Sequence, residues 1–99
     1  MRHYCFYTYI LSNPGRTVFY IGFTKSLSKR LREHKGNRGT RNSFAGSVYC
    51  YELVYFETHK YVLNAIALEK QLKRWRKSKK IALIKSMNPR MLTLNGQFY

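Results

Sequence analysis

The stretch YIGFTKSLSKRLREH, residues 20–34, decides the fold of this chain. It opens with aromatic and β-branched residues, which are typical of a strand. Gly22 is expected to end that strand, and Thr24 or Ser26 to cap a helix that begins at Leu27. The stretch therefore predicts a strand, a short turn and a helix in immediate succession.

One face of the predicted helix combines apolar and ionisable side chains. Positions i, i+3, i+4 and i+7 of this face are Leu27, Arg30, Leu31 and His34. The two leucines predict that the face points toward the core, and a guanidinium next to the core is costly unless an anion meets it. A glutamate is the ordinary partner for such an arginine. Because the chain has only four acidic residues, an anionic ligand becomes a serious alternative.

A second strand is predicted on the N-terminal side of this stretch. Residues 4–11 carry apolar or aromatic side chains on both alternating faces, which indicates a strand covered on both sides. Residues 13–16 form a turn in which the glycine can take a positive φ, and residues 17–23 return as the antiparallel partner. The hairpin could set Tyr9 and Tyr20 near one another on one face, although several registers are compatible with the sequence.

The remainder of the chain predicts a third strand and two helices. A basic, glycine-rich loop follows the first helix, and it could either lie along phosphates or simply be mobile. An apolar tail at the end could lie against the core or fray. We therefore expect an α/β (α+β) fold with a small central three-stranded antiparallel sheet flanked by helices. The predicted segments are the loop 35–46, the strand 48–56, the main helix 59–76 with a break or bend at 75–80, the final helix 81–87 ended by Asn88-Pro89, and the tail 92–99.

Glu69 stands out on the main helix. The predicted buried stripe consists of Val62, Ile66, Glu69, Leu72 and Lys73, widened by Leu63, Ala67 and Leu68. A carboxylate thus interrupts an aliphatic face. Its ordinary explanation is an i,i+4 pair with Lys73, which would contribute about 0.2–0.5 kcal/mol. The other three glutamates are predicted on the solvent side of the first helix or on the third strand.

Charge and composition indicate the kind of partner. The 99 residues predict one domain, 1–99, and contain 19 Lys and Arg against four acids, a formal net charge of +15. Self-repulsion of this size favours a polyanionic partner, and basic residues together with 16% aromatics suit nucleic acid. No apolar run is long enough to span a membrane, so a cytoplasmic location, either free in the cytosol or with the nucleoid, is expected. Cys5 and Cys50 are then expected to be reduced structural thiols.

These motifs carry a resemblance to a known family. Tyr20-Ile21-Gly22 is a literal YIG, and Tyr7-Thr8-Tyr9 stands where that family has Gly-Ile-Tyr, keeping its tyrosine. Together with Arg30, His34 and ALEKQLKRWRKSKKIALIKSMNP at 67–89, residues 4–89 resemble the GIY-YIG nucleases, especially small stand-alone members related to the nuclease domain of the bacterial excinuclease C subunit. Residues 90–99 form a tail beyond this match, where Arg90-Met91 replaces the acidic-aromatic pair that such proteins often carry.

The resemblance implies a metal-dependent endonuclease that hydrolyses phosphodiester bonds in DNA, in repair or recombination. It assigns Glu69 to one Mg²⁺ or Mn²⁺ ion and Arg30 to the phosphate oxygens. Tyr9 or Tyr20 would orient or deprotonate the attacking water, and His34 would support the site by hydrogen bonds. Other repair proteins are possible partners.

Further basic side chains are expected to contact the nucleic-acid backbone. A non-catalytic nucleic-acid-binding module on the same scaffold is the main alternative, followed by a basic ribosome-associated or architectural protein. The sequence leaves DNA and RNA both open as the substrate. The predicted backbone contacts are Lys29, Arg38, Arg41, Lys73, Arg76 and Lys77.

Overall fold

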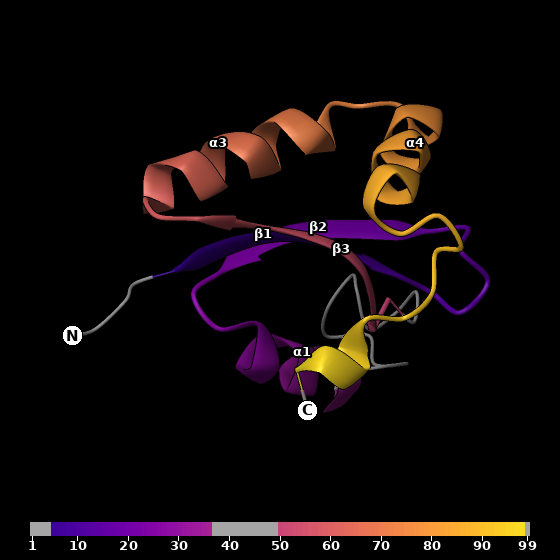
Figure 1. The fold of residues 1–99 in the computed structure, drawn as a ribbon, viewed down its shortest axis with the longest axis horizontal. Helices are drawn as coiled ribbons and strands as arrows, with labels where there is room; N and C mark the ends of the chain where they lie inside the picture. The colour runs from indigo at the N-terminus through magenta and orange to yellow at the C-terminus, as the bar shows by residue number, and fades with distance from the viewer. Residues whose placement is uncertain (1–4, 37–49, 99) are drawn as a thin grey trace.

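Strand β1 lies at the centre of a three-stranded antiparallel sheet with the order β2-β1-β3. The computed structural model describes residues 5–36 and 50–98, and of residues 34–36 it describes the backbone only. Helices α3 and α4 cover one face of the sheet, while α1 and the C-terminal segment cover the other (Figure 1). The predicted α+β fold is confirmed. The elements are β1 Phe6–Ser12, β2 Phe19–Thr24, α1 Leu27–Gly36, β3 Glu52–His59, α3 Val62–Lys73, α4 Lys77–Met87 and the 3-10 turn η1 Asn95–Gln97.

Alternate residues of β1 enter two separate apolar clusters. Tyr9 and Leu11 face α1, where Leu27 and Leu31 are buried against them. Ile10 faces the other way and packs with residues of α3 and α4, including Leu72 and Ile84. The prediction that this strand is covered on both sides is therefore confirmed. Within the described residues, no helix has the length and apolarity needed to cross a membrane.

The hairpin turn differs from the sequence prediction in one backbone detail. The N–H of Arg16 donates to the carbonyl of Asn13 at 3.1 Å, which closes the predicted turn around Pro14 and Gly15. The positive φ, however, belongs to Arg16 (58°) and not to Gly15. The Asn13 side-chain oxygen accepts hydrogen bonds from the next two backbone N–H groups, those of Thr17 and Val18, and so replaces the pairing that the turn interrupts.

Helix α1 begins as the sequence predicts. The Thr24 hydroxyl accepts from the N–H of Ser26 at 3.1 Å, and the Ser26 hydroxyl accepts from the N–H of Lys29 at 3.4 Å, so both candidate residues help to satisfy the first turn. Leu27 and Leu31 are buried, which confirms the predicted inward face. The loop predicted for residues 35–46 lies mostly outside the described residues.

The inward face of the main helix is only partly the one predicted: Leu72 of the predicted stripe is buried, but the face is shifted away from Val62 and Lys73 toward Ala65. Ala65 and Leu72 are its buried residues, whereas the side chains of Val62 and Leu63 are exposed and Lys73 points outward. The residues from 62 to 68 are apolar at every position except Asn64, so several helical phases fit the sequence equally well. The chain does break after this helix as predicted, but α4 begins at Lys77 and not at residue 81.

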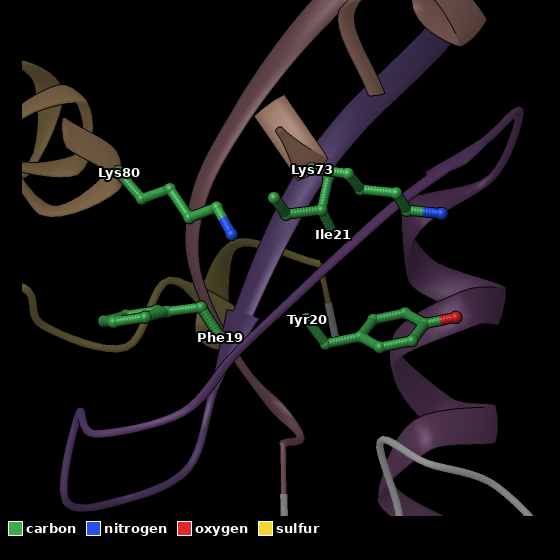
Figure 2. Close-up of a pocket in the computed structure, with 5 residues that line it drawn as sticks. All are labelled: Phe19, Tyr20, Ile21, Lys73 and Lys80. Atoms are coloured by element: carbon green, nitrogen blue, oxygen red, sulfur yellow. The ribbon is translucent and has the colours of Figure 1, made fainter. Parts of the chain in front are cut away.

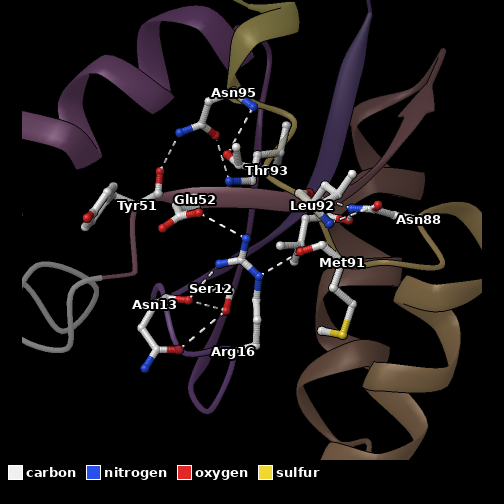
Figure 3. A network of polar contacts seen from close by, with 12 residues as sticks. Ser12, Asn13, Arg16, Tyr51, Glu52, Asn88, Met91, Leu92, Thr93 and Asn95 are labelled. Carbon is white, nitrogen blue, oxygen red and sulfur yellow. Dashed lines mark hydrogen bonds and ion pairs between the residues drawn. The ribbon is translucent and has the colours of Figure 1, made fainter.

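The C-terminal tail lies against the free edge of β3. The N–H of Leu94 donates to the carbonyl of Leu53 at 2.7 Å. The side-chain amide of Asn95 accepts from the N–H of Leu53 at 2.7 Å and donates to the carbonyl of Tyr51 at 3.0 Å, as a neighbouring strand would (Figure 3). Of the two predicted outcomes for the tail, the structure therefore supports docking over fraying.

Arg16 and Asn88 fix this tail to the rest of the fold. The Arg16 guanidinium donates to the carbonyl of Met91 and to Glu52, at 2.8 and 3.0 Å, and also to the carbonyl of Asn13 (Figure 3). The buried Asn88 amide donates to two backbone carbonyls and accepts from one backbone N–H. Both side chains thus hold the tail through hydrogen bonds to the backbone and, for Arg16, to Glu52.

Candidate active site

Tyr9 forms the buried centre of the candidate site. It lies on the central strand with only 1% of its surface exposed, directly opposite Gly22 of β2. A Cβ atom on Gly22 would lie 2.5 Å from the Tyr9 hydroxyl oxygen and 2.7 Å from its Cζ, so the tyrosine occupies the space that any side chain at residue 22 would need. The predicted role of Gly22 as the end of the strand is wrong, since β2 continues to Thr24.

Arg30 reaches this buried hydroxyl from α1. Its Nε donates to the Tyr9 oxygen at 3.3 Å, and a terminal nitrogen pairs with Glu33 at 3.0 Å. The hydrogen bond to Tyr9 is the main reason that the pKa of Arg30 is raised above its usual value, so the guanidinium stays charged. The glutamate partner considered for Arg30 is real, but both side chains of that pair are more than 40% exposed, and such pairs are weak.

Tyr9 and Tyr20 share a face of the sheet, as the hairpin predicted. Tyr20 pairs with Leu11, two residues along β1 from Tyr9, which makes the two tyrosines diagonal neighbours. Burial raises the pKa of the Tyr9 hydroxyl, and the hydrogen bond from Arg30 opposes this increase. Tyr9 is consequently a neutral phenol at physiological pH. Tyr20 is only half-buried and lines a surface hollow.

Glu69 approaches the same group of residues from α3. Its side chain is 13% exposed, and one carboxylate oxygen accepts from the Lys73 ammonium at 2.6 Å, which is the predicted i,i+4 pair. Its negative charge also raises the pKa of Tyr9, as does Tyr20. Tyr9 therefore interacts electrostatically with Arg30, Tyr20 and Glu69, three of the residues that the sequence singled out. His34 lies on α1, but its side chain is outside the described part.

Glu69 is compatible with a single divalent metal ion. In the described segments there is no cluster of three His, Cys, Asp or Glu residues that could form a complete protein cage. Mg²⁺ does not need one, because it is commonly bound by one or two carboxylates together with phosphate oxygens and water. The Lys73 ammonium already neutralises the Glu69 carboxylate, so metal binding would compete with this ion pair.

Two surface hollows adjoin these residues. One, of about 170 Å³, lies at the start of α1. The other, of about 230 Å³, lies between β2 and the α3–α4 region (Figure 2). The first is lined by Thr24, Lys25, Ser26, Lys29, Arg30 and Glu33, and the second by Phe19, Tyr20, Ile21, Lys73 and Lys80.

The predicted nucleic-acid contacts are only partly placed by the structure. Lys29 and Lys73 line the two hollows, while Arg76 is exposed between α3 and α4 and Lys77 is exposed at the first position of α4. Arg38 and Arg41 lie outside the described residues. Lys80 and Phe19 were not predicted, because the hollow that they share is formed by segments far apart in the sequence.

Comparison with known proteins identifies the family to which the chain belongs. The family model of the GIY-YIG catalytic domain matches residues 5–82, and the chain therefore belongs to the GIY-YIG nuclease family. The fold is similar to the solution NMR structure of the UPF0213 protein BH0048 from Bacillus halodurans, with a TM-score of 0.54 and 21% identity over 87% of this chain and 88% of the other. No curated protein sequence matches the chain significantly.

Proposed function

We propose that this protein is an endonuclease that hydrolyses phosphodiester bonds in DNA with the help of one divalent metal ion. The observation that supports this most directly is the contact between the buried Tyr9 hydroxyl and Arg30, with Glu69 and Tyr20 close enough to influence the same hydroxyl. A neutral phenol, a permanent cation and a carboxylate are thus gathered beside an open surface. Phosphodiester hydrolysis needs charge relief on the phosphate and an activated water.

Arg30 is the group proposed to receive the phosphate. Its planar fork suits two phosphate oxygens at once, and its pKa is raised, so its charge is constant. The hydrogen bond from its Nε to Tyr9 holds one side of the fork, while the other side meets Glu33 in an exposed pair. A phosphate can replace that weak pair without disturbing the bond to Tyr9.

Tyr20 is the tyrosine proposed to contact the attacking water. Tyr9 is fully buried and its pKa is raised, which makes it a poor base and better suited to orienting Arg30. Tyr20 lines a hollow that a substrate can enter. Glu69 would hold Mg²⁺ or Mn²⁺, and the bound ion would supply charge relief at the leaving 3′-oxygen.

The biological setting is proposed more broadly. The net charge of +15 supports electrostatic attraction to a nucleic-acid backbone. The resemblance to the excinuclease C nuclease domain motivates a role in DNA repair or recombination in the cytoplasm, alongside other repair proteins.

The alternative is a nucleic-acid-binding module that has lost cleavage. Two observations favour it: Lys73 neutralises Glu69, and Tyr7 stands where the family has glycine. The second is weakened by the structure, because the Tyr7 ring packs edge-on against Phe56 with centroids 6.3 Å apart, and Tyr9 still reaches Arg30.

Incubation with nucleic acids separates these two functions. The full chain is mixed with single-stranded, duplex, flap and branched DNAs, and with single-stranded RNA, in Mg²⁺, Mn²⁺ or chelator. The nuclease proposal expects cleavage of at least one DNA that requires the metal ion. Tight binding of all DNAs with no cleavage in either metal would establish the binding module instead.

A further inference from the structure

The hollow beside β2 is lined by two chemically distinct kinds of side chain. In Figure 2 the rings of Phe19 and Tyr20 point in opposite directions from β2, with the Lys80 side chain above Phe19 and the Lys73 ammonium above Tyr20. Ile21 is 5% exposed and forms an apolar part of the lining. The hollow, about 230 Å³, thus pairs aromatic and aliphatic surface with two ammonium groups.

The parts of this hollow are held by different elements. Phe19 is half-buried because its ring packs against the cluster around Ile10 and Leu72, so its position is fixed by the core. Lys73 comes from the end of α3 and Lys80 from the first turns of α4. The break between these two helices therefore brings both ammonium groups over the edge strand of the sheet.

This combination matches the chemistry of one nucleotide. Aromatic side chains stack on bases with little regard to sequence, while lysines attract the phosphates that flank them. A base inside a duplex is stacked on its neighbours and cannot offer its face to a protein ring, whereas an unpaired base can. The hollow therefore suits an unpaired strand better than a continuous duplex.

We propose that this hollow binds an unpaired nucleotide, with its base against Phe19 and its flanking phosphates at Lys73 and Lys80. Lys73 also pairs with Glu69, and Tyr20 lines the hollow as well as neighbouring Tyr9, so the bound nucleotide lies next to the candidate active site. The inference deepens the proposed function, on which it rests, by assigning its substrate class: nucleic acid with unpaired nucleotides beside the bond that is cut.

Binding measured in chelator tests this without relying on cleavage. Fluorescence anisotropy gives the Kd of the full chain for a single-stranded DNA, a single-stranded RNA and a blunt DNA duplex of equal length. Phe19→Leu removes the ring while keeping an apolar side chain against the core, and Lys80→Ala removes one ammonium group. Lys85→Ala is the matched control, because it removes the same charge from an exposed position of α4 that does not line the hollow.

Phe19→Leu is expected to weaken single-strand binding about fivefold or more while changing duplex binding less than twofold. Lys80→Ala should weaken single-strand binding more than Lys85→Ala does. Melting temperatures verify that each variant is folded. The proposal is overturned if folded Phe19→Leu keeps the wild-type ratio of single-strand to duplex affinity, or if Lys80→Ala and Lys85→Ala are equivalent on every substrate. The binding assay contains no metal ion, so it tests this proposal even if the protein does not cut DNA in the nuclease assay.

Discussion

The hydroxyl of Tyr9 lies over the backbone of Gly22, its partner across the β1–β2 hairpin, at a distance that leaves no room for a Cβ atom. This close approach explains the last residue of the YIG motif in physical terms. Glycine is needed here because it has no side chain. It does not end the strand, which continues to Thr24. This glycine allows the Tyr9 ring to lie across residue 22 on the face of the hairpin that α1 covers, where Arg30 can reach the hydroxyl.

Replacing Gly22 with alanine should therefore displace Tyr9 and abolish cleavage. The new methyl group would lie 2.5 Å from the Tyr9 oxygen, so the ring must move and lose its bond to Arg30. We expect a loss of about 1–3 kcal/mol in the free energy of unfolding and loss of cleavage. Gly15→Ala is the control, because a methyl group there would meet no atom closer than 3.9 Å and the residue has no positive φ. Equal stability and activity of the two variants would contradict the assignment.

Arg30→Lys should separate charge from geometry. Lysine keeps the positive charge but cannot bond Tyr9 and a phosphate in the same planar arrangement. We expect cleavage to fall by about 100-fold or more, with DNA affinity within about twofold of wild type. Arg32→Lys, on an exposed position of the same helix, serves as the control and should cut normally. Normal cleavage by Arg30→Lys would show that a point charge is sufficient there.

The buried thiol of Cys50 should make the stability of the fold decrease at alkaline pH. Burial raises the pKa of its thiol from 9.0 to about 11. Between these values the unfolded chain has lost the thiol proton while the folded protein retains it, so stability should fall as pH rises, by roughly 1 kcal/mol per pH unit. Below pH 9 the contribution is constant. Chemical denaturation at pH 8, 9, 10 and 11 measures the slope in wild type and in Cys50→Ala.

Tyrosines also ionise in this range, so the difference between the two proteins is the relevant quantity. Cys5→Ala, at the partly exposed free thiol, controls for the loss of a cysteine. If wild type and Cys50→Ala lose stability in parallel from pH 9 to 11, the buried thiol does not titrate as described.

The edge of β3 depends on the Asn95 amide. Asn95→Ala leaves the N–H of Leu53 and the carbonyl of Tyr51 without the side chain that pairs with them. We expect a loss of about 1–3 kcal/mol in unfolding free energy. Asn95→Asp keeps the acceptor and should lose less. Asn64→Ala, on an exposed position of α3, should change stability by under about 0.5 kcal/mol. The measurement is denaturant unfolding. If Asn95→Ala has the wild-type free energy of unfolding, water replaces the amide without cost.

The sequence predicted the elements whose pattern is local. The alternation around Tyr9, the capping residues before Leu27 and the spacing of Leu27, Arg30 and Leu31 each report on one strand or one helix. These residues take the predicted faces because burial of the same side chains decides both the pattern and the packing. The placement of Tyr9 and Tyr20 on one face follows from the same alternation.

Features that depend on contacts between distant segments could not be predicted. The apolar residues at the start of α3 fit several helical phases, and only the sheet selects the face of Ala65 and Leu72. An irregularity in the β1–β3 pairing at Ile10 and Leu11 leaves Val54 as an extra residue in β3. The approach of Tyr9 to Gly22 likewise required the hairpin register.

Glu69→Gln tests the central claim most directly, because it removes the proposed metal-binding charge while nearly preserving volume. The measurement is metal-dependent cleavage per folded molecule, with melting temperature and DNA affinity determined on the same samples. Glu57→Gln, which removes a carboxylate from β3, is the matched control. The account predicts that Glu69→Gln folds with a loss of about 1 kcal/mol or less, binds DNA and does not cut, while Glu57→Gln cuts normally. Cleavage at the wild-type rate by well-folded Glu69→Gln would contradict the assignment of this site.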